Sequence, residues 1–375
     1  MSGIYIHIPF CKQACHYCDF HFSTSMNKKD DMVLALVKEL LMRKDEFDNE
    51  IVETIYFGGG TPSVLEIADI KLLIHTVYQN YTVVENPEIT LEANPDDLSL
   101  ERIIALSNNR INRLSIGIQS FFEDDLQMMN RAHNADEAKA CLQFATQYFD
   151  NISLDLIYGI PGMSNEKWQQ NIETALSFDI PHISSYALTV EPKTALKKLI
   201  QTGKIAEPND EVAQEHFMIL VEMLESNGFI HYELSNFGKL DYFSKNNSSY
   251  WLGKKYLGIG PSAHSYNGIS RSWNVANNAL YLKSIQENQL PSETETLTIT
   301  DRYNEYIMTG LRTIWGVSLM RIETDFGAET LTYLKKQAQK FLDDGLLLID
   351  DNILKTTSKG KFLTDGIASD LFMLN

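Results

Sequence analysis

The stretch Ile4-Tyr-Ile-His-Ile-Pro-Phe-Cys11-Lys-Gln-Ala-Cys15-His-Tyr-Cys18 decides how the rest of the chain is interpreted. A short β-rich run, residues 4–8, leads directly into three cysteines with the spacing CxxxCxxC. Three thiolates on one tight loop can ligate three irons of a cubane iron–sulfur cluster. The fourth iron would then stay open to an exogenous ligand, as in a reactive centre rather than a closed structural site. The stretch therefore predicts a strand that ends in a metal-binding loop.

A zinc site is the alternative interpretation of the same loop, with His7, His16 or His21 as the fourth ligand. Zinc ligands more often come as paired CxxC knuckles, which favours the iron–sulfur interpretation. The fourth cysteine, Cys141, lies on an apolar stretch with helical spacing, so we expect a buried core thiol there.

Composition and charge exclude several classes of protein. The 375 residues carry 50 acidic and 32 basic side chains, a formal net charge of −18, which argues against nucleic acid or an anionic membrane surface as a partner. No apolar run approaches the roughly 18 residues of a transmembrane helix, and no basic export signal precedes residues 4–8. We therefore expect a cytoplasmic protein without a transmembrane segment.

Six β-rich runs alternate with stretches of helical spacing in the first half of the chain. The runs are residues 4–8, 52–57, 88–93, 113–118, 152–158 and 182–188. Such alternation predicts parallel βαβ units, and hence an α/β fold that is either a barrel or a doubly wound sheet.

Polar and glycine residues follow or end these runs. They are the three cysteines, residues 58–62, Glu92, Gln119 and Asp155. Loops at the carboxyl ends of parallel strands gather on one side of the sheet, where active sites are built. The sequence therefore predicts one shared site.

The second half of the chain is less regular. Residues 210–227 read as a helix, residues 232–273 are rich in glycine and aromatic side chains, and residues 276–300 read as a polar connecting segment. From residue 301 helices are followed by a hairpin with Asp351-Asn352 at its tip, the pattern of a small winged-helix-like domain. Its 11 acidic and 9 basic residues do not favour DNA binding.

Several ordered motifs together resemble one known family. CxxxCxYC after the first strand and Gly-Gly-Gly-Thr-Pro at 58–62 after the second resemble the radical S-adenosylmethionine (SAM) enzymes. Three further motifs resemble the oxygen-independent coproporphyrinogen III oxidase group. They are Tyr5-Ile-His-Ile-Pro-Phe-Cys11, Leu114-Ser-Ile-Gly-Ile-Gln119 and Asp155-Leu-Ile-Tyr-Gly-Ile-Pro161. The resemblance implies a partial (β/α)6 barrel over residues 1–230, an extension and connector over 231–300, and a C-terminal winged-helix-like domain over 301–375.

One position separates two branches of that group. The oxidases carry another cysteine two residues after the third, where this chain has Phe20, and the sequence Cys18-Asp-Phe resembles the haem chaperones of the HemW branch. The resemblance implies a protein that binds haem and passes it to an acceptor protein, with membrane-associated acceptors among the candidates. Coproporphyrinogen oxidase activity, or another radical SAM reaction, is the alternative, and the absence of a cysteine at position 20 disfavours the oxidase.

The resemblance also implies a set of cofactor-binding residues. Cys11, Cys15 and Cys18 would hold a [4Fe-4S] cluster. The positions that match the family's SAM contacts are Tyr5, Tyr17, Gly59, Gly60, Thr61, Glu92, Gln119, Arg131, Asp155 and Ala187. Arg131 suits a carboxylate, and the glycines would let the backbone approach the ligand closely.

The prediction of haem binding rests on fewer residues. Haem chaperones of this branch usually show His-Asn-x-x-Tyr-Trp, and this chain has Asn246 in place of the histidine, followed by Tyr250 and Trp251. Asparagine is a poor iron ligand compared with imidazole. His264 and His231 are therefore the candidate iron ligands, and Tyr250 and Trp251 either stack on the porphyrin or pack against the barrel.

Overall fold

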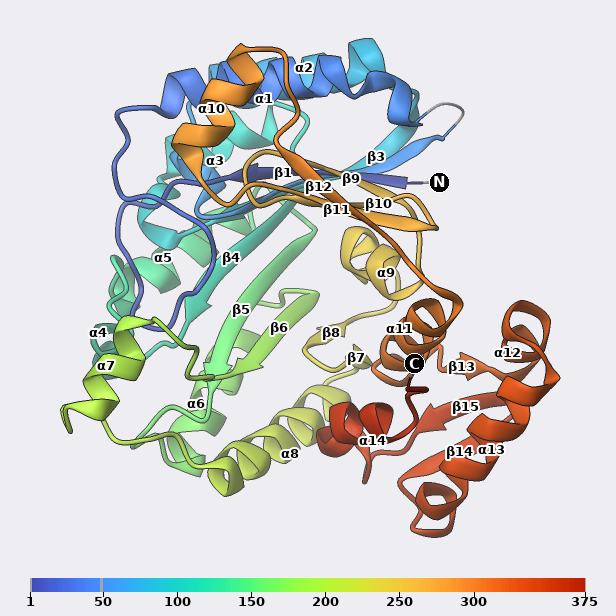
Figure 1. The fold of residues 1–375 in the computed structure, drawn as a ribbon. Coiled ribbons are helices and arrows are strands. Elements are labelled where there is room, and N and C mark those ends of the chain that lie inside the picture. The colour runs from blue at the N-terminus through green and yellow to red at the C-terminus, as the bar shows by residue number, and fades with distance from the viewer. Residues whose placement is uncertain (1, 48–49, 375) are drawn as a thin grey trace.

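Six parallel strands form the centre of the molecule, as the alternating pattern predicts. The computed structural model describes residues 2–47 and 50–374. The strands pair in chain order: β1 (Ser2–Ile8), β2 (Val52–Gly59), β3 (Val83–Ala93), β4 (Arg113–Gln119), β5 (Ile152–Tyr158) and β6 (His182–Ala187). The connecting helices are α1 (Lys29–Met42), α2 (Ile67–Asn80), α3 (Leu100–Ser107), α4 (Glu123–Met128), α5 (Ala135–Ala145) and α6 (Asn165–Leu176). Figure 1 shows the curved sheet with these helices on its outside, which confirms the partial (β/α)6 barrel.

The two faces of these strands differ in polarity. On β5, Leu154 and Leu156 are fully buried in the main hydrophobic core, whereas the alternate residues Ser153 and Asp155 face the interior of the barrel. The same alternation places Glu92 and Ser115 on the inner face of the neighbouring strands, since the two residues are register partners. Parallel strands are usually apolar on both faces. A polar inner face therefore marks the interior of this barrel as a place for ligands rather than for packing.

The sheet continues beyond the six strands at both edges. On one side β9 (Tyr256–Ile259) pairs with β1, followed by β10 (His264–Tyr266), β11 (Ser270–Asn274) and β12 (Ser292–Thr296); on the other, β8 (Asn236–Gly238) and β7 (Ile230–Glu233) follow β6. The prediction of a mere connecting segment at 276–300 is wrong, because it contains α10 (Asn278–Gln286) as well as β12. Tyr281 of α10 donates to the buried carboxylate of Glu39 at 2.5 Å, which fixes the extension on α1.

A short helix, α9 (Lys245–Trp251), closes the amino-terminal end of the barrel, opposite the cysteines. The carboxylate of Glu88 on β3 accepts from the backbone N–H groups of Lys245 and Asn246, each at 3.1 Å. The side-chain oxygen of Asn246 also accepts from Thr54 Oγ1 at 3.0 Å. The helix is thus bonded to two strands of the barrel floor.

The C-terminal part has its own hydrophobic core. Its elements are α11 (Ile299–Leu311), β13 (Val317–Ser318), α12 (Leu319–Phe326), α13 (Ala328–Asp343), β14 (Leu347–Asp350), β15 (Ile353–Thr356) and α14 (Thr364–Asp370). Asp351 and Asn352 both have positive φ, 46° and 59°, at the tip of the β14–β15 hairpin, as predicted. This helical domain joins the barrel at β7, where Ile314 N donates to Tyr232 O at 3.0 Å.

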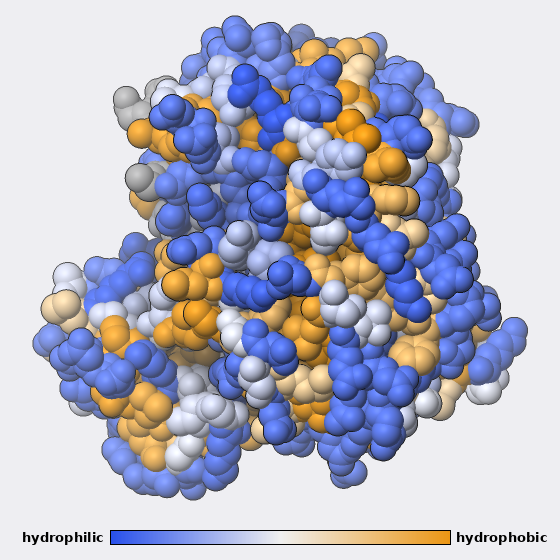
Figure 2. All heavy atoms as spheres, turned by 180° about the vertical axis from the view of Figure 1, so that it is seen from behind, coloured by the Kyte–Doolittle hydropathy of each residue, from blue (hydrophilic) through white to orange (hydrophobic). Residues whose placement is uncertain are grey.

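Two further helices, α7 (Ala195–Gln201) and α8 (Asp210–Ser226), follow β6. No helix in the described part of the chain is both long and apolar enough to cross a bilayer. The face opposite to that of Figure 1 carries a strip of hydrophobic residues down its middle, between hydrophilic surfaces on either side (Figure 2).

Candidate functional site

The three cysteines lie together on the loop that follows β1. Phe10 forms a parallel bridge with Ser23, and Cys11 N donates to Ser23 O at 3.1 Å, which closes the loop at its base. All three thiols are free; Cys11 is buried, and Cys15 and Cys18 are half-buried. The loop thus presents three thiols at the carboxyl end of the barrel.

Two of these sulfurs are joined by a chain of side-chain hydrogen bonds. Thr61 Oγ1 donates to Cys11 Sγ at 3.3 Å and accepts from Asn94 Nδ2 at 3.3 Å. Asn94 Oδ1 accepts from Arg131 Nη2 at 2.7 Å, and Arg131 Nη1 donates to Cys15 Sγ at 3.3 Å. Residues after β2, after β3 and after α4 therefore all fix the cysteine loop.

The donor set suits an iron–sulfur cluster. Burial raises the pKa of the Cys11 and Cys18 thiols to about 11, so without a metal both remain protonated at neutral pH. Metal binding requires the thiolate form. The hydroxyl of Thr61 and the cation of Arg131 point at sulfur as donors, which stabilises negative charge there.

The histidines that a zinc site would need have other partners. His7 Nε2 lies 2.9 Å from His21 O and its Nδ1 lies 3.2 Å from Tyr5 OH. His16 Nδ1 contacts Met128 O, and His21 Nε2 contacts Asn278 Oδ1. Both ring nitrogens of His7 therefore have partners, which disfavours His7 as a zinc ligand.

The glycines after β2 allow two backbone segments to approach each other. Gly59 has φ +108°, and a Cβ there would lie 2.5 Å from the His7 ring. A Cβ on Gly60 would lie 2.6 Å from Phe10 O. Thr61 N donates to this same oxygen at 2.7 Å. These glycines are therefore required where β2 meets the base of the cysteine loop, and the predicted close approach of a ligand to them stays a prediction.

Two carboxylates project into the barrel interior beneath this loop. Glu92 accepts from Tyr56 OH at 2.7 Å and from Gly59 N at 3.2 Å, and Asp155 accepts from Ser115 Oγ at 3.4 Å. Burial raises the pKa of Glu92 to about 7 and that of Asp155 to about 6. Tyr5 stacks on Tyr56 with ring centroids 6.0 Å apart, so an aromatic wall adjoins the acids.

Three more residues of the predicted SAM set lie in the cysteine loop or at strand ends. Tyr17 OH accepts from Arg131 Nη1 at 3.4 Å. Gln119 ends β4 with φ +67°, and a Cβ on Gly117 would lie 2.9 Å from Gln119 Nε2 and 3.2 Å from Arg131 Nη2. Ala187 ends β6 and packs against the hydrophobic core. The structure therefore brings Tyr17, Gln119 and Arg131 together, and it places Ala187 at the end of β6 against the core.

Asn94 and Gly117 are site residues that the sequence reasoning missed. Asn94 binds both Thr61 and Arg131, and Gly117 O accepts from Arg131 Nη2 at 2.8 Å. Asn94 directly follows β3, so the rule that strand ends carry the site would have found it.

The haem candidates lie on the extension of the sheet. His264 is exposed on β10, with its ring centroid 6.1 Å from that of Trp273 on β11. Tyr256 lies 6.2 Å from Tyr266, and Tyr250 of α9 meets Tyr256 edge-on at 4.6 Å. These five rings, which we call the aromatic surface, are only partly covered. Trp251, in contrast, lies under Arg312 of the C-terminal part, 5.2 Å from its guanidinium.

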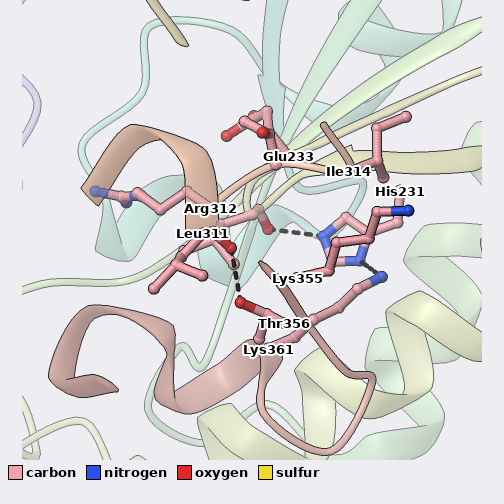
Figure 3. Close-up of a pocket in the computed structure, with 10 residues that line it drawn as sticks. His231, Glu233, Leu311, Arg312, Ile314, Lys355, Thr356 and Lys361 are labelled. Carbon is pink, nitrogen blue, oxygen red and sulfur yellow. Dashed lines mark hydrogen bonds between the residues drawn. The ribbon is translucent and has the colours of Figure 1, made fainter. Parts of the chain in front are cut away.

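The side chains of His231 and Asn246 make contacts within the fold. His231 stacks on Phe237 at 4.1 Å, its Nε2 lies 3.1 Å from Leu234 O, and its Nδ1 accepts from Lys361 at 2.8 Å. It lines a pocket of about 240 Å³ between β7 and the C-terminal part (Figure 3). Asn246 is buried in the barrel floor. His231 and Asn246 are both buried, so His264 is the more accessible of the two predicted histidines.

Comparisons with known proteins agree with this geometry. Residues 5–175 match the family model of the Radical SAM superfamily, and residues 297–363 match the HemN C-terminal domain. The Heme chaperone HemW of Bacillus subtilis is 35% identical over 97% of each chain, and that of Lactococcus lactis is 32% identical over 98% of each. The solved structure of coproporphyrinogen III oxidase (HemN) from Escherichia coli, a radical SAM enzyme, superimposes with a TM-score of 0.86 at 23% identity, over 99% of this chain and 90% of that one. The chain therefore belongs to the heme chaperone HemW family within the radical SAM superfamily.

Proposed function

We propose that this chain binds haem and passes it to an acceptor protein, on a barrel that holds a [4Fe-4S] cluster and SAM. The observation that carries the proposal is full-length identity of 35% to a heme chaperone, in a chain whose three free thiols share one loop. The radical SAM family itself implies the cluster and SAM.

Cys11, Cys15 and Cys18 would hold the cluster, and the interior beside them would receive SAM. When bound, the cluster and SAM supply one-electron chemistry. Arg131 keeps one guanidinium nitrogen, Nε, without a partner among the described residues, and this N–H suits the methionyl carboxylate. Glu92 and Asp155 offer acceptor oxygens for ammonium and ribose hydroxyl groups.

The aromatic surface supports the haem part of the proposal. Haem is flat and apolar, and aromatic rings provide apolar area at low entropic cost. His264 is an exposed imidazole beside Trp273, which is the kind of axial ligand that haem iron accepts. Arg271, paired with Glu305, lies on the neighbouring strand and suits a haem carboxylate.

The oxidase alternative is not favoured. Phe20, where the oxidases carry a further cysteine, is 68% exposed beside the cysteine loop. The similarity to the oxidase structure, at 23% identity, concerns the fold.

Anaerobic haem titration tests the proposal. We expect the wild type to shift the Soret band with about one haem per chain, His264→Ala to lose most of this shift, and His231→Gln to retain it. Consumption of SAM with coproporphyrinogen, in the absence of haem binding, would replace the proposal with an oxidase.

We further propose a cytoplasmic location, because the cysteine thiols must remain reduced. The acceptor is an unidentified protein, with membrane-associated acceptors among the candidates. Transfer of bound haem to candidate apo-proteins, followed by the Soret band of the acceptor, tests that step.

A further inference from the structure

Arg113 is one of the largest fully buried side chains of the molecule. It begins β4 on the inner face, as the register partner of Thr90, and is only 1% exposed. Its Nε atom and the neighbouring Thr90 Oγ1 are both buried without a hydrogen-bond partner in the described chain. Nor does Arg113 form an ion pair within 4 Å among the described residues. A buried cation without a partner is costly, so this residue requires a compensating role.

Two carboxylates lie on the strands next to that of Arg113, further towards the carboxyl end of the barrel. Glu92 follows Thr90, the register partner of Arg113, by two residues on β3. Asp155 follows Leu154, the register partner of Ile116, on β5, and both acids share the inner face with Arg113. Burial is the main cause of their raised pKa values, their mutual repulsion adds to that of Glu92, and the charge of Arg113 lowers both. The cation thus favours the ionised form of both acids.

One further carboxylate, Glu88, lies two residues before Thr90 on the same face of β3, but its oxygens accept from the backbone N–H groups of Lys245 and Asn246. The remaining groups near the two acids are mostly neutral. Tyr5, Tyr56, Tyr186 and Tyr250 come from β1, β2, β6 and α9, and their pKa values are all raised by burial, so they stay neutral. His182 is also neutral, since burial lowers its pKa well below the usual value. Arg131 is charged, but it is bonded to Cys15, Asn94 and Gly117. Among the groups described here, Arg113 is the cation not committed to another partner.

We propose that Arg113 is a positioning residue of the SAM site, whose guanidinium is the shared counter-charge that keeps Glu92 and Asp155 available as carboxylate acceptors for the ligand. The inference rests on the proposed binding of SAM. The inference explains why the Arg113 cation is buried in an interior that also holds carboxylates. It also explains why Arg113 forms no close ion pair, because one guanidinium stabilises two carboxylates at longer range.

Infrared titration of the purified, cluster-containing chain without SAM tests the charge directly. Carbon-13-labelled Glu and Asp distinguish the two residue types, and Glu92→Gln and Asp155→Asn assign the bands. In Arg113→Met the protonation midpoints of both acids should rise by about one pH unit or more, whereas Arg113→Lys should keep them near the wild-type values. Unchanged midpoints in Arg113→Met would overturn the proposal.

The pH dependence of SAM binding gives the second readout. Equilibrium dialysis with radiolabelled SAM should show about tenfold weaker binding for Arg113→Met at pH 7, with recovery at higher pH. An equal loss at every pH would mean a merely structural role and would contradict the proposal. Arg43→Met is the matched control, a buried arginine paired with Glu39 and Glu46 outside the barrel interior; it should leave both midpoints unchanged.

Two outcomes separate this inference from its premise. If the wild type binds no SAM, the proposed function fails, while the infrared midpoints still decide the role of Arg113. If Arg113→Met does not fold, the double variant Arg113→Met/Glu92→Gln should fold better, because one of the two repelling acids is gone. A double variant that folds no better than the single one would count against the counter-charge.

Discussion

Asn94 Oδ1 accepts a 2.7 Å hydrogen bond from Nη2 of Arg131, so an amide at the end of β3 holds the arginine that contacts Cys15. The same amide donates to Thr61, which contacts Cys11. One neutral side chain thus orients the donors of two cysteines on either side of it.

Replacing Asn94 should therefore weaken binding of the proposed cluster without removing one of its cysteine ligands. We expect Asn94→Ala to lose iron to a chelator about tenfold faster than the wild type, as substitutions of groups that orient metal ligands typically do. Asn80→Ala is the control, because the Asn80 amide bonds only to Thr76 O on α2. Equal release rates for the two variants would show that the Asn94 bonds do not matter.

The two kinds of cysteine should behave differently. Cys15→Ser should abolish the cluster, measured as iron content and visible absorption after anaerobic reconstitution, whereas the wild type should hold about four irons per chain. Cys141 is buried on α5 in the main core, so Cys141→Ala should keep the iron and lose about 1 kcal/mol of unfolding free energy. Iron loss in Cys141→Ala would assign that thiol to the metal site.

Gly59→Ala should be more damaging than a glycine substitution in open space. Both Gly59 and Gly203 have positive φ, +108° and +69°, but only at Gly59 would a Cβ meet another group, the His7 ring at 2.5 Å. We expect Gly203→Ala to cost about 1 kcal/mol and Gly59→Ala at least about 2 kcal/mol more, in chemical unfolding. Similar costs at the two positions would mean that His7 moves aside freely.

Glu92 should make the folded state less stable as the pH rises. Its pKa is raised by burial from an ordinary 4.5 to about 7, so the folded chain binds a proton more tightly than the unfolded chain. The contribution of Glu92 to the free energy of unfolding is therefore fully present below about pH 4.5. It decreases as the pH rises towards 7, by at most about 3 kcal/mol. Asp155, with its pKa raised to about 6, acts in the same direction.

Glu92→Gln should remove the part of this pH dependence that Glu92 contributes and leave the part from Asp155. The unfolding free energy of the variant should fall less than that of the wild type between pH 4.5 and 7, as measured by urea unfolding at a series of pH values. Glu173→Gln, at an exposed position on α6, should leave the wild-type curve unchanged. A variant curve parallel to that of the wild type would mean that Glu92 is already ionised at low pH.

The core of the fold could be predicted because its signals are local. Each of the six strands is a short β-rich run, and Asp155 stood out because an unpaired carboxylate is costly on so apolar a strand. Strand β12, by contrast, reads Ser-Glu-Thr-Glu-Thr and is exposed along its whole length. It pairs with β11 through backbone bonds, which no hydrophobic pattern reveals.

Only the site residues that belong to recognisable sequence motifs could be predicted. The cysteines and the strand-end residues carry recognisable spacing, but Asn94 and Arg131 are 37 positions apart and meet only through the fold. Arg113 looked like the polar start of a strand, and its near-complete burial depends on neighbours from several elements. The role suggested for His231 could not be judged without knowing that Phe237, Leu234 and Lys361 surround it.

Glu88 and Thr54 bond helix α9 to β3 and β2 at the end of the barrel away from the cysteines. These bonds hold the helix across that end of the interior. Loosening the helix should therefore give dissolved oxygen a second route to the proposed cluster. The shelf life of the protein in air should thus depend on a carboxylate far from the metal, a weakness that sequence inspection of the cysteine loop alone would never reveal.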